Sequence, residues 1–296
     1  MLRLLFTHQA FLALALLGLL LAWAAYVHVE TSQEVNRFSD WVPPSNAETS
    51  SEPFVFVDPR DVLAFTLKPG VWKKQLVGAG RVPYLEELVE LELALGAEEA
   101  SHTYQVDVAV YFGLADGCEL HVVGGEAYSL NRGHFVTVFP GVFHSAAHAG
   151  GRQRCKVLRA VHRSGAFAPS PKKEVEAKRL EDLSSVKTAH ESPKLSKRVF
   201  IAHGEVPGLF QVSMSRFASG AECETHSHQS AAEVYVNFDG QGCHLEMKGV
   251  EAPGQLSMDL SGGKVAVVNP LTSHRAWNSA KAPCHNFNML LGPPSE

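Results

Sequence analysis

The stretch from Gly220 to Gly240, which reads GAECETHSHQSAAEVYVNFDG, decides the fold. His226 and His228 stand two residues apart in it, and Glu233 follows five residues later. Side chains alternate between the two faces of a strand, so both imidazoles should project from one face. A short turn after His228 would let the chain double back and bring Glu233 to that face. Two imidazoles and a carboxylate that converge in this way are typical ligands of a divalent metal ion.

A second stretch further downstream supplies a fourth candidate ligand. It reads VVNPLTSHRAWN from Val267 to Asn278 and contains His274. The blander interpretation is that these histidines are ordinary core residues, or that the fold has been retained and the metal lost. Because the glutamate, both glycines and the downstream histidine are all in register, we expect a metal site formed by His226, His228, Glu233 and His274.

These two stretches resemble the paired motifs of the cupin family. The first matches the pattern G-x5-H-x-H-x4-E-x6-G at every fixed position. The second keeps the family's Pro, His and Asn but carries Leu271 and Thr272 where a Gly is usual. The resemblance covers residues 199–293. It implies a small antiparallel β-barrel that holds one metal ion through three histidines and one glutamate.

The sequence contains two copies of this pattern. GAEEASHTY from Gly96 matches GAECETHSH from Gly220, and VFPGVFHSAAH, which contains His144, matches VNPLTSHRAWN. Short alternating runs separated by glycine-rich turns are typical of an all-β sandwich or barrel, and a repeat of this length indicates a duplicated unit. We therefore predict an all-β fold of two tandem cupin barrels, each a double-stranded β-helix or jelly roll, preceded by an N-terminal hydrophobic helix.

The two copies differ in their chemistry. The first keeps His102 and His144, but Tyr104 and Ala109 replace the second histidine and the glutamate of the motif. Asp107 could supply the missing carboxylate only if the strand register shifted by two residues. We expect the first barrel to be a structural partner. The alternative is a separate ligand pocket that uses His102, Tyr104 and His144.

The amino terminus carries an unbroken apolar run at residues 10–27, with Arg3 before it. The run is long enough to cross a bilayer as a helix, while residues 22–24 fit a small-x-small cleavage site. A single-pass anchor and a cleaved signal peptide therefore both stay open, with a transit peptide as a further alternative. Either of the first two would place the barrels on the extracytoplasmic or lumenal side, and only the anchor would attach the chain to a membrane.

The predicted organisation has five parts. Between the barrels, the linker carries apolar residues at helical spacing, which predicts one amphipathic helix. The parts are an N-terminal signal anchor or signal peptide at residues 1–30, a flexible stalk at 31–53, a degenerate N-terminal barrel at 54–163, a charged linker with a helix at 164–197, and a metal-binding C-terminal barrel at 198–296.

Composition excludes some classes of function. The formal net charge of −5 and the pI near 6.3 give no basic patch for a nucleic acid. Of the five cysteines none forms a CxxC pair, which excludes a zinc ribbon. Two pairs occupy matching positions in the two copies, and such positions usually lie far apart. Repeat symmetry therefore argues against a disulfide between Cys118 and Cys243 or between Cys155 and Cys284.

The chemistry we expect is that of a six-coordinate divalent ion with open positions. Such an ion can polarise a carbonyl, activate a water or, if iron, activate dioxygen. We predict one divalent transition metal, Fe, Mn or Zn, and a metal-dependent enzyme acting on a small organic molecule, with oxygenase-type chemistry ahead of an isomerase or lyase. The alternative is a non-enzymatic bicupin whose metal and pocket bind a ligand or stabilise the barrel. A homodimer is expected only by analogy with other cupins.

Three residues beyond the ligands are candidates for a role in the site. Tyr235 lies two residues after Glu233 and should share its face, so its phenol could serve as acid or base. The other interpretation of Tyr235 is a core tyrosine with its hydroxyl hydrogen-bonded. Asn278 and Gln229 could orient the imidazoles, or could instead satisfy turn backbone.

Overall fold

The computed structural model describes residues 54–293, apart from residues 152, 165–173, 189, 191, 239–241 and 249–254. The predicted hydrophobic helix and the predicted stalk lie outside the described residues. Within the part of the chain that is described, no helix is both long and apolar enough to cross a membrane.

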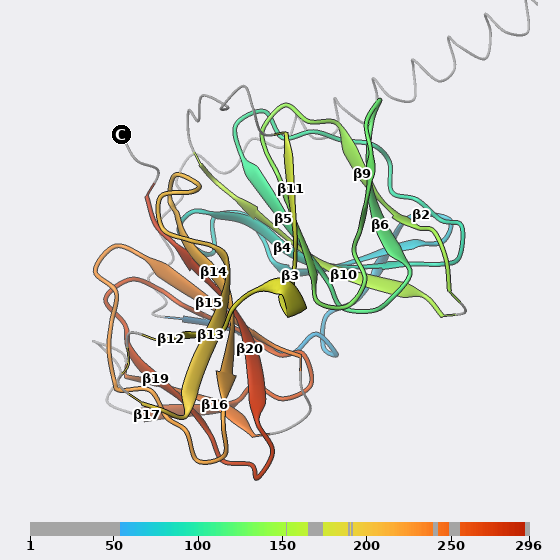
Figure 1. Ribbon diagram of the computed structural model, residues 1–296. Helices are drawn as coiled ribbons and strands as arrows, with labels where there is room; N and C mark the ends of the chain where they lie inside the picture. The colour runs from blue at the N-terminus through green and yellow to red at the C-terminus, as the bar shows by residue number, and fades with distance from the viewer. Residues whose placement is uncertain are drawn as a thin grey trace, which may run out of the picture. The chain divides into compact units, whose positions relative to one another are not determined.

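Apart from one 3-10 turn, every helix or strand of the described residues is a β-strand, which confirms the prediction of an all-β fold (Figure 1). In the first barrel a seven-stranded sheet in the order β11-β8-β5-β10-β4-β3-β2 faces a three-stranded sheet in the order β7-β6-β9. The strand bounds are β2 (Phe65–Lys68), β3 (Val71–Val77), β4 (Leu85–Leu93), β5 (Val108–Gly113), β6 (Cys118–Val122), β7 (Ala127–Ser129), β8 (His134–Val138), β9 (His144–His148), β10 (Cys155–His162) and β11 (Val175–Arg179).

The second barrel repeats this plan. Its seven-stranded sheet has the order β1-β18-β15-β20-β14-β13-β12, and its three-stranded sheet has the order β17-β16-β19. The strand bounds are β1 (Phe54–Val57), β12 (Val186–Lys187), β13 (Leu195–Ile201), β14 (Leu209–Phe217), β15 (Ala232–Asn237), β16 (Cys243–Lys248), β17 (Gln255–Asp259), β18 (Val265–Val268), β19 (Ser273–Asn278) and β20 (Cys284–Leu291).

The large sheets are buried on both faces, which explains why β5 and β15 read as nearly continuous apolar runs. In β15, Val234 and Val236 join an apolar core that both barrels share, whereas Tyr235 belongs to the core inside the second barrel. Aromatic rings fill the shared core: Phe135 and Phe200 stack with centroids 4.7 Å apart. Alternation along each strand therefore sends one set of side chains between the barrels and the other set into a barrel.

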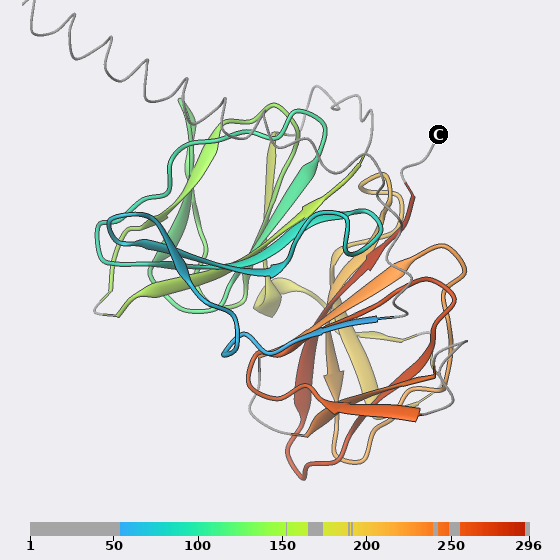
Figure 2. The same ribbon diagram turned by 180° about the vertical axis from the view of Figure 1, so that it is seen from behind.

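Each barrel completes a sheet with a strand from outside its own segment. β1 pairs with β18 of the second barrel, so residues 54–57 do not join the first barrel as the predicted boundary at residue 54 implied. Figure 2 shows β1, in blue, among the orange and red strands of the second barrel. β11, from the linker, pairs with β8 of the first barrel.

The linker differs from the prediction in a second way. In its described part it forms β11, a single 3-10 turn at Leu180–Asp182 and the short β12, in place of the predicted amphipathic helix. β8 would otherwise leave a row of backbone N–H and C=O groups unpaired at the sheet edge. Pairing with that edge outweighs the local helical spacing, while Leu180 and Leu183 still pack against the shared core.

Each barrel contains one disulfide at the equivalent place. Cys118 bonds to Cys155, and Cys243 bonds to Cys284. Both bonds join a strand of the small sheet to a strand of the large sheet. Cys223 is free and buried.

Candidate metal centre

The second barrel brings all four predicted ligands together. The ligand atoms of His226, His228, Glu233 and His274 lie within 4.8 Å of one another. Glu233 Oε2 lies 3.0 Å from His228 Nε2, 3.1 Å from His274 Nε2 and 3.9 Å from His226 Nε2. One carboxylate oxygen therefore faces three ring nitrogens.

The backbone fixes two of these rings opposite each other. His226 and His274 form an isolated antiparallel bridge, in which each backbone N–H donates to the other residue's carbonyl, at 2.9 and 2.8 Å. Their ring centroids lie 4.3 Å apart as a result. The sequence predicted a regular strand over His226 and His228. In the structure, the segment that carries them, before β15, pairs only at isolated bridges. Glu233 comes from β15 itself.

The turn before His274 keeps its shape without the family's usual glycine. Leu271 has a φ of 67°, which is the left-handed conformation, and its backbone N–H donates to His228 O at 2.7 Å. The equivalent residue in the first barrel is Gly141, with a φ of 84°. A leucine adopts this conformation only at a cost. The departure from the motif therefore changes the strain in the turn and leaves the placement of His274 unchanged.

Backbone carbonyls orient the imidazoles. His226 Nδ1 lies 2.9 Å from Glu224 O, and His274 Nδ1 lies 2.9 Å from Thr272 O. A ring that donates its Nδ1–H to a carbonyl directs Nε2 at the metal position.

The two residues predicted to orient the rings lie elsewhere. Asn278 donates to three backbone carbonyls, those of Phe217, Ala218 and Ala282, so it satisfies turn backbone. Gln229 is exposed. Orientation by backbone carbonyls leaves no signature in side-chain identity, which is why the sequence did not reveal it.

The hydrogen-bond partners of His274 indicate that the site fits a cation. Thr272 O faces its Nδ1, and Glu233 Oε2 faces its Nε2 at 3.1 Å. A neutral imidazole carries only one N–H, so the ring alone cannot donate to both oxygens. A proton or a metal ion between Nε2 and Oε2 satisfies both. Three nitrogens and one carboxylate oxygen suit a divalent transition metal.

The same contacts set the charge states of the site. Burial lowers the pKa of His274, but its hydrogen bond to Glu233 and the charge of that residue outweigh burial and raise the pKa. Burial would raise the pKa of Glu233, yet hydrogen bonds from His228 and His274 hold it well below its usual range. The second carboxylate oxygen faces Asn288 Nδ2 at 3.5 Å. The site thus keeps Glu233 as an anion.

Tyr235 lies where the sequence placed it, on the face of β15 that carries Glu233. Its side chain is 3% exposed, and its ring centroid lies 6.1 Å from that of His274. Burial, reinforced by the charge of Glu233, raises the pKa of the phenol well above its usual value. The phenol therefore keeps its proton, and its catalytic role stays a prediction.

Two neighbours of the site were not predicted as part of it. His190, from the linker, places its ring 4.7 Å from that of His226. Together with Cys223 these two histidines form a second group of possible metal ligands whose atoms lie within 4.8 Å of one another. The second neighbour is Lys197 on β13, whose pKa is lowered by burial and raised in part by the charge of Glu233. An isolated linker histidine and a strand lysine belong to no motif, so no pattern could have found them.

The first barrel holds a guanidinium at the equivalent place. The bridge between His102 and His144 is kept. Arg159 Nη1 lies 2.6 Å from Glu99 Oε1 and 3.3 Å from His102 Nε2, and its Nε lies 2.9 Å from Glu87 Oε1. Arg159 is opposite Tyr111 in the sheet, as Asn288 is opposite Tyr235.

In the first barrel, an internal cation therefore occupies the place that the candidate metal site takes in the second. Tyr104 donates to Glu87 at 3.3 Å, so it belongs to this ionic cluster. Ala109 pairs with Val138 as Glu233 pairs with Val268, so the register shift that would have recruited Asp107 does not occur. The alternative prediction is a ligand pocket formed by His102, Tyr104 and His144. Arg159 lies beside His102, at 3.3 Å from its Nε2, and so occupies part of the space that such a pocket would need.

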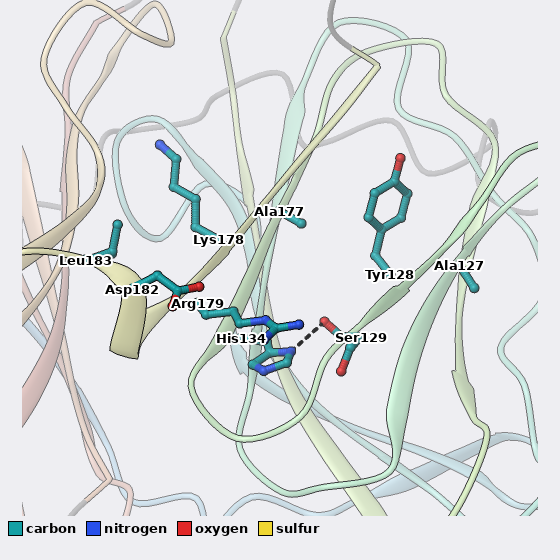
Figure 3. A pocket seen from close by; sticks show the side chains of 9 residues that line it. All are labelled: Ala127, Tyr128, Ser129, His134, Ala177, Lys178, Arg179, Asp182 and Leu183. Carbon is teal, nitrogen blue, oxygen red and sulfur yellow. Dashed lines mark hydrogen bonds between the residues drawn. The ribbon is translucent and has the colours of Figure 1, made fainter.

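A separate surface cavity of about 420 Å³ lies between β7, β8, β11 and the 3-10 turn (Figure 3). His134 Nδ1 lies 3.2 Å from Ser129 O at its wall, and Lys178, Arg179 and Asp182 also line it. The cavity contains none of the predicted site residues.

Comparison with known proteins rests on structure. No protein-family model matches the sequence, and no curated protein matches it. An oxalate decarboxylase of Lactobacillus farciminis, solved as a formate complex, matches with a TM-score of 0.61 and 15% identity over 86% of this chain and 90% of that chain. The oxalate decarboxylase of Bacillus subtilis, a protein with Mn(II) centres, matches with a TM-score of 0.61 and 12% identity over 86% of this chain and 81% of that chain.

A third neighbour is a globulin. The 7S globulin of Momordica charantia matches with a TM-score of 0.61 and 12% identity, over 83% of this chain and 85% of that chain. At such identities the likeness shows the fold alone. These neighbours are cupin-fold proteins, and the described strands follow the same plan. The chain therefore has the cupin fold.

Proposed function

We propose that this chain is a metal-dependent enzyme whose second barrel holds one divalent ion through His226, His228, Glu233 and His274 and acts on a small organic molecule. The observation that carries the proposal is the meeting of three ring nitrogens around one carboxylate oxygen, at 3.0, 3.1 and 3.9 Å. When bound, an Fe, Mn or Zn ion would supply open positions at which a substrate oxygen can be polarised or, for iron, dioxygen activated.

The chain's own residues would prepare this site in two ways. Glu224 O and Thr272 O hold the imidazoles of His226 and His274 with Nε2 toward the centre. Tyr235 is buried and protonated, so in the proposed role its O–H can deliver a proton to a bound molecule or hold Glu233 in place. We propose oxygenase-type chemistry ahead of isomerase or lyase chemistry. The decarboxylase neighbours favour keeping the lyase class in the screen.

A non-enzymatic role is the second candidate, because the 7S globulin shares the fold. In that case the metal or the pocket would only bind a ligand or stabilise the barrel. The retention of a full ligand set in one barrel, beside its replacement by Arg159 in the other, favours the enzyme.

Metal content gives the first test. Elemental analysis of the full chain purified from its native source should find close to one Fe, Mn or Zn per chain, and His226→Ala should abolish it. His102→Ala, the counterpart in the first barrel, is the matched control and should leave the metal in place. Wild-type protein without a stoichiometric metal would contradict the proposal.

The enzyme and binding roles are then separated by turnover. Loaded protein should consume dioxygen or release a product when screened with small phenols, sugars and organic acids, and Tyr235→Phe should slow that turnover without loss of metal. A full complement of metal that is inaccessible to azide or nitric oxide would favour the structural role instead.

The compartment is also a proposal. One disulfide in each barrel is typical of proteins that fold in an oxidising environment, which supports an extracytoplasmic or lumenal location. Alkylation of the unreduced protein under denaturing conditions, which expose the buried Cys223, should label Cys223 alone. Labelling of all five cysteines would argue for a reducing compartment.

A further inference from the structure

The duplication allows the charges inside the two barrels to be compared position by position. In the first barrel Lys73 Nζ lies 2.7 Å from Glu87 Oε2. The equivalent lysine in the second barrel, Lys197, donates instead to the neutral amide of Gln211 at 2.8 Å. No carboxylate of the described residues lies within the 4.0 Å ion-pair distance of Lys197 Nζ. The same position thus holds a compensated charge in one barrel and an uncompensated charge in the other.

Other charged residues inside the barrels increase the difference in charge between them. The first barrel balances Arg159 and Lys73 with Glu87 and Glu99. The second barrel has the neutral Cys223 at the place of Glu99. Glu233 is the one carboxylate in its group of four candidate ligands. With a divalent ion present, the positive charge of the ion and of Lys197 exceeds the negative charge of Glu233. A positive excess in a partly desolvated site attracts an anion.

Lys197 is placed to meet a molecule at the metal. Leu195, two residues earlier on β13, belongs to the core inside the second barrel, so Lys197 shares that inward face. Its side chain is half-buried, and burial lowers its pKa against the opposing effect of Glu233. The lysine therefore lies within electrostatic reach of the ligand set, and protein atoms have displaced part of its hydration.

One acceptor atom beside the candidate ligands has no hydrogen-bond donor among the described residues. Asn288 is 8% exposed, and its Nδ2 faces Glu233 Oε1 at 3.5 Å. Its Oδ1 is buried without a hydrogen-bond partner among the described residues. A buried acceptor without a donor is costly, and a hydroxyl group of a bound molecule would satisfy it.

We propose that the second barrel binds a small carboxylate, whose charge is neutralised by the Lys197 ammonium and whose hydroxyl group donates to Asn288 Oδ1. This inference rests on the proposed metal centre, because the excess charge depends partly on the ion. It names the substrate class as hydroxycarboxylates, of which glycolate is the smallest.

The test uses full-length protein loaded with Mn(II), with glycolate as the probe and glycolamide as its neutral analogue. Binding is followed by the change in water-proton relaxation as a ligand displaces water near Mn(II), and metal content is measured in every sample. Wild-type protein should bind glycolate more tightly than glycolamide. Lys197→Met should weaken glycolate by roughly tenfold to a hundredfold, the strength of a hydrogen bond to a charged group, and should leave glycolamide unchanged.

Two further variants separate charge from packing. Gln211→Glu imports the pair that the first barrel already forms between Lys73 and Glu87, so it should weaken glycolate while Lys197 is still present. Lys197→Arg should retain most of the affinity. Equal glycolate affinity in wild type, Lys197→Met and Gln211→Glu, with one metal per chain in each, would overturn the proposal and leave the metal centre standing.

A separate measurement covers the case in which the protein binds no metal. If the wild type retains no Mn(II), the proposed function fails, and calorimetric titration of the metal-free protein with glycolate then decides the role of Lys197. Glycolate binding by the wild type that is lost in both Lys197→Met and Gln211→Glu would support the anion site, and equal binding by the wild type and both variants would remove it.

Discussion

Single residues show where this chain departs from the cupin motifs that it resembles and how the structure accommodates the departure. Leu271 occupies a turn position at which the first barrel has Gly141, and both have positive φ values, of 67° and 84°. Its side chain is 63% exposed, so packing does little to offset the strained backbone. The turn is held instead by the hydrogen bond from Leu271 N–H to His228 O.

Replacement of this leucine by glycine should stabilise the protein. We expect Leu271→Gly to raise the free energy of unfolding by about 0.5–1 kcal/mol, since the cost of the left-handed conformation, about 1–2 kcal/mol, exceeds the extra entropy of an unfolded glycine. Urea unfolding measures the change. Gly141→Leu, the reciprocal change, should destabilise by a similar amount. A loss of stability in Leu271→Gly would mean that the leucine side chain contributes a contact that outweighs the strain.

Asp107 predicts a pH dependence of stability. Burial, together with the charge of Glu86, raises the pKa of Asp107 from 3.8 to about 6, and its Oδ1 is buried without a partner among the described residues. Because the folded-state pKa is raised, the folded protein binds the proton more tightly than the unfolded chain. The favourable contribution is therefore complete below pH 3.8 and is lost as the pH rises through about 6.

Asp107→Asn removes this penalty. We expect a gain of about 1–2 kcal/mol at pH 8, after a discount for the half-exposed side chain, and a gain that shrinks toward zero as the pH approaches 3.8. Chemical unfolding at several pH values measures it. A gain independent of pH would show that the amide acts through packing or hydrogen bonding.

At the scale of elements, the strands that carry short-range motifs were predictable and the strands that depend on distant partners were not. The candidate ligands could be found because His226, His228 and Glu233 lie close in sequence and His274 has its own motif. The cluster around Arg159 draws on β4, β10 and the loop before β5, and no local pattern joins them. The linker strand β11 depends on the free edge of β8, which only the assembled sheet provides.

We expect the Arg159 cluster to stabilise the first barrel. Arg159 is 4% exposed and pairs with Glu87 and Glu99, so Arg159→Met would leave the buried Glu99 without its guanidinium partner and Glu87 with Lys73 alone. We expect a loss of about 3–5 kcal/mol in the free energy of unfolding.

An exposed ion pair supplies the control for this measurement. Arg163, whose side chain is 57% exposed, pairs with Glu86 on the surface, and Arg163→Met should cost at most about 1 kcal/mol. Both variants should leave the metal content that we propose for the second barrel unchanged. If Arg159→Met were as stable as Arg163→Met, the cluster would not be what holds the first barrel together.

The whole molecule is held by paired features, of which the disulfides are the most symmetric. The two bonds close loops of similar length, with sequence separations of 37 and 41 residues. Loop-closure entropy predicts about 3–4 kcal/mol of stability for each. The double variants Cys118→Ser/Cys155→Ser and Cys243→Ser/Cys284→Ser should therefore lose similar amounts in urea unfolding. A large difference between the stability losses of the two double variants would indicate that the barrels unfold independently. That result would contradict the cooperative unfolding expected from the apolar core that they share.

The exchange of edge strands limits how the chain can be divided. A fragment that starts at residue 198 would lack β1, β12 and the start of β13, so β18 would end its sheet with exposed peptide groups. A fragment that ends at residue 163 would lack β11, and β8 would be left in the same state. Exposed sheet edges recruit other chains, so either half produced alone should self-associate. Assays of the proposed function therefore need both halves in one polypeptide.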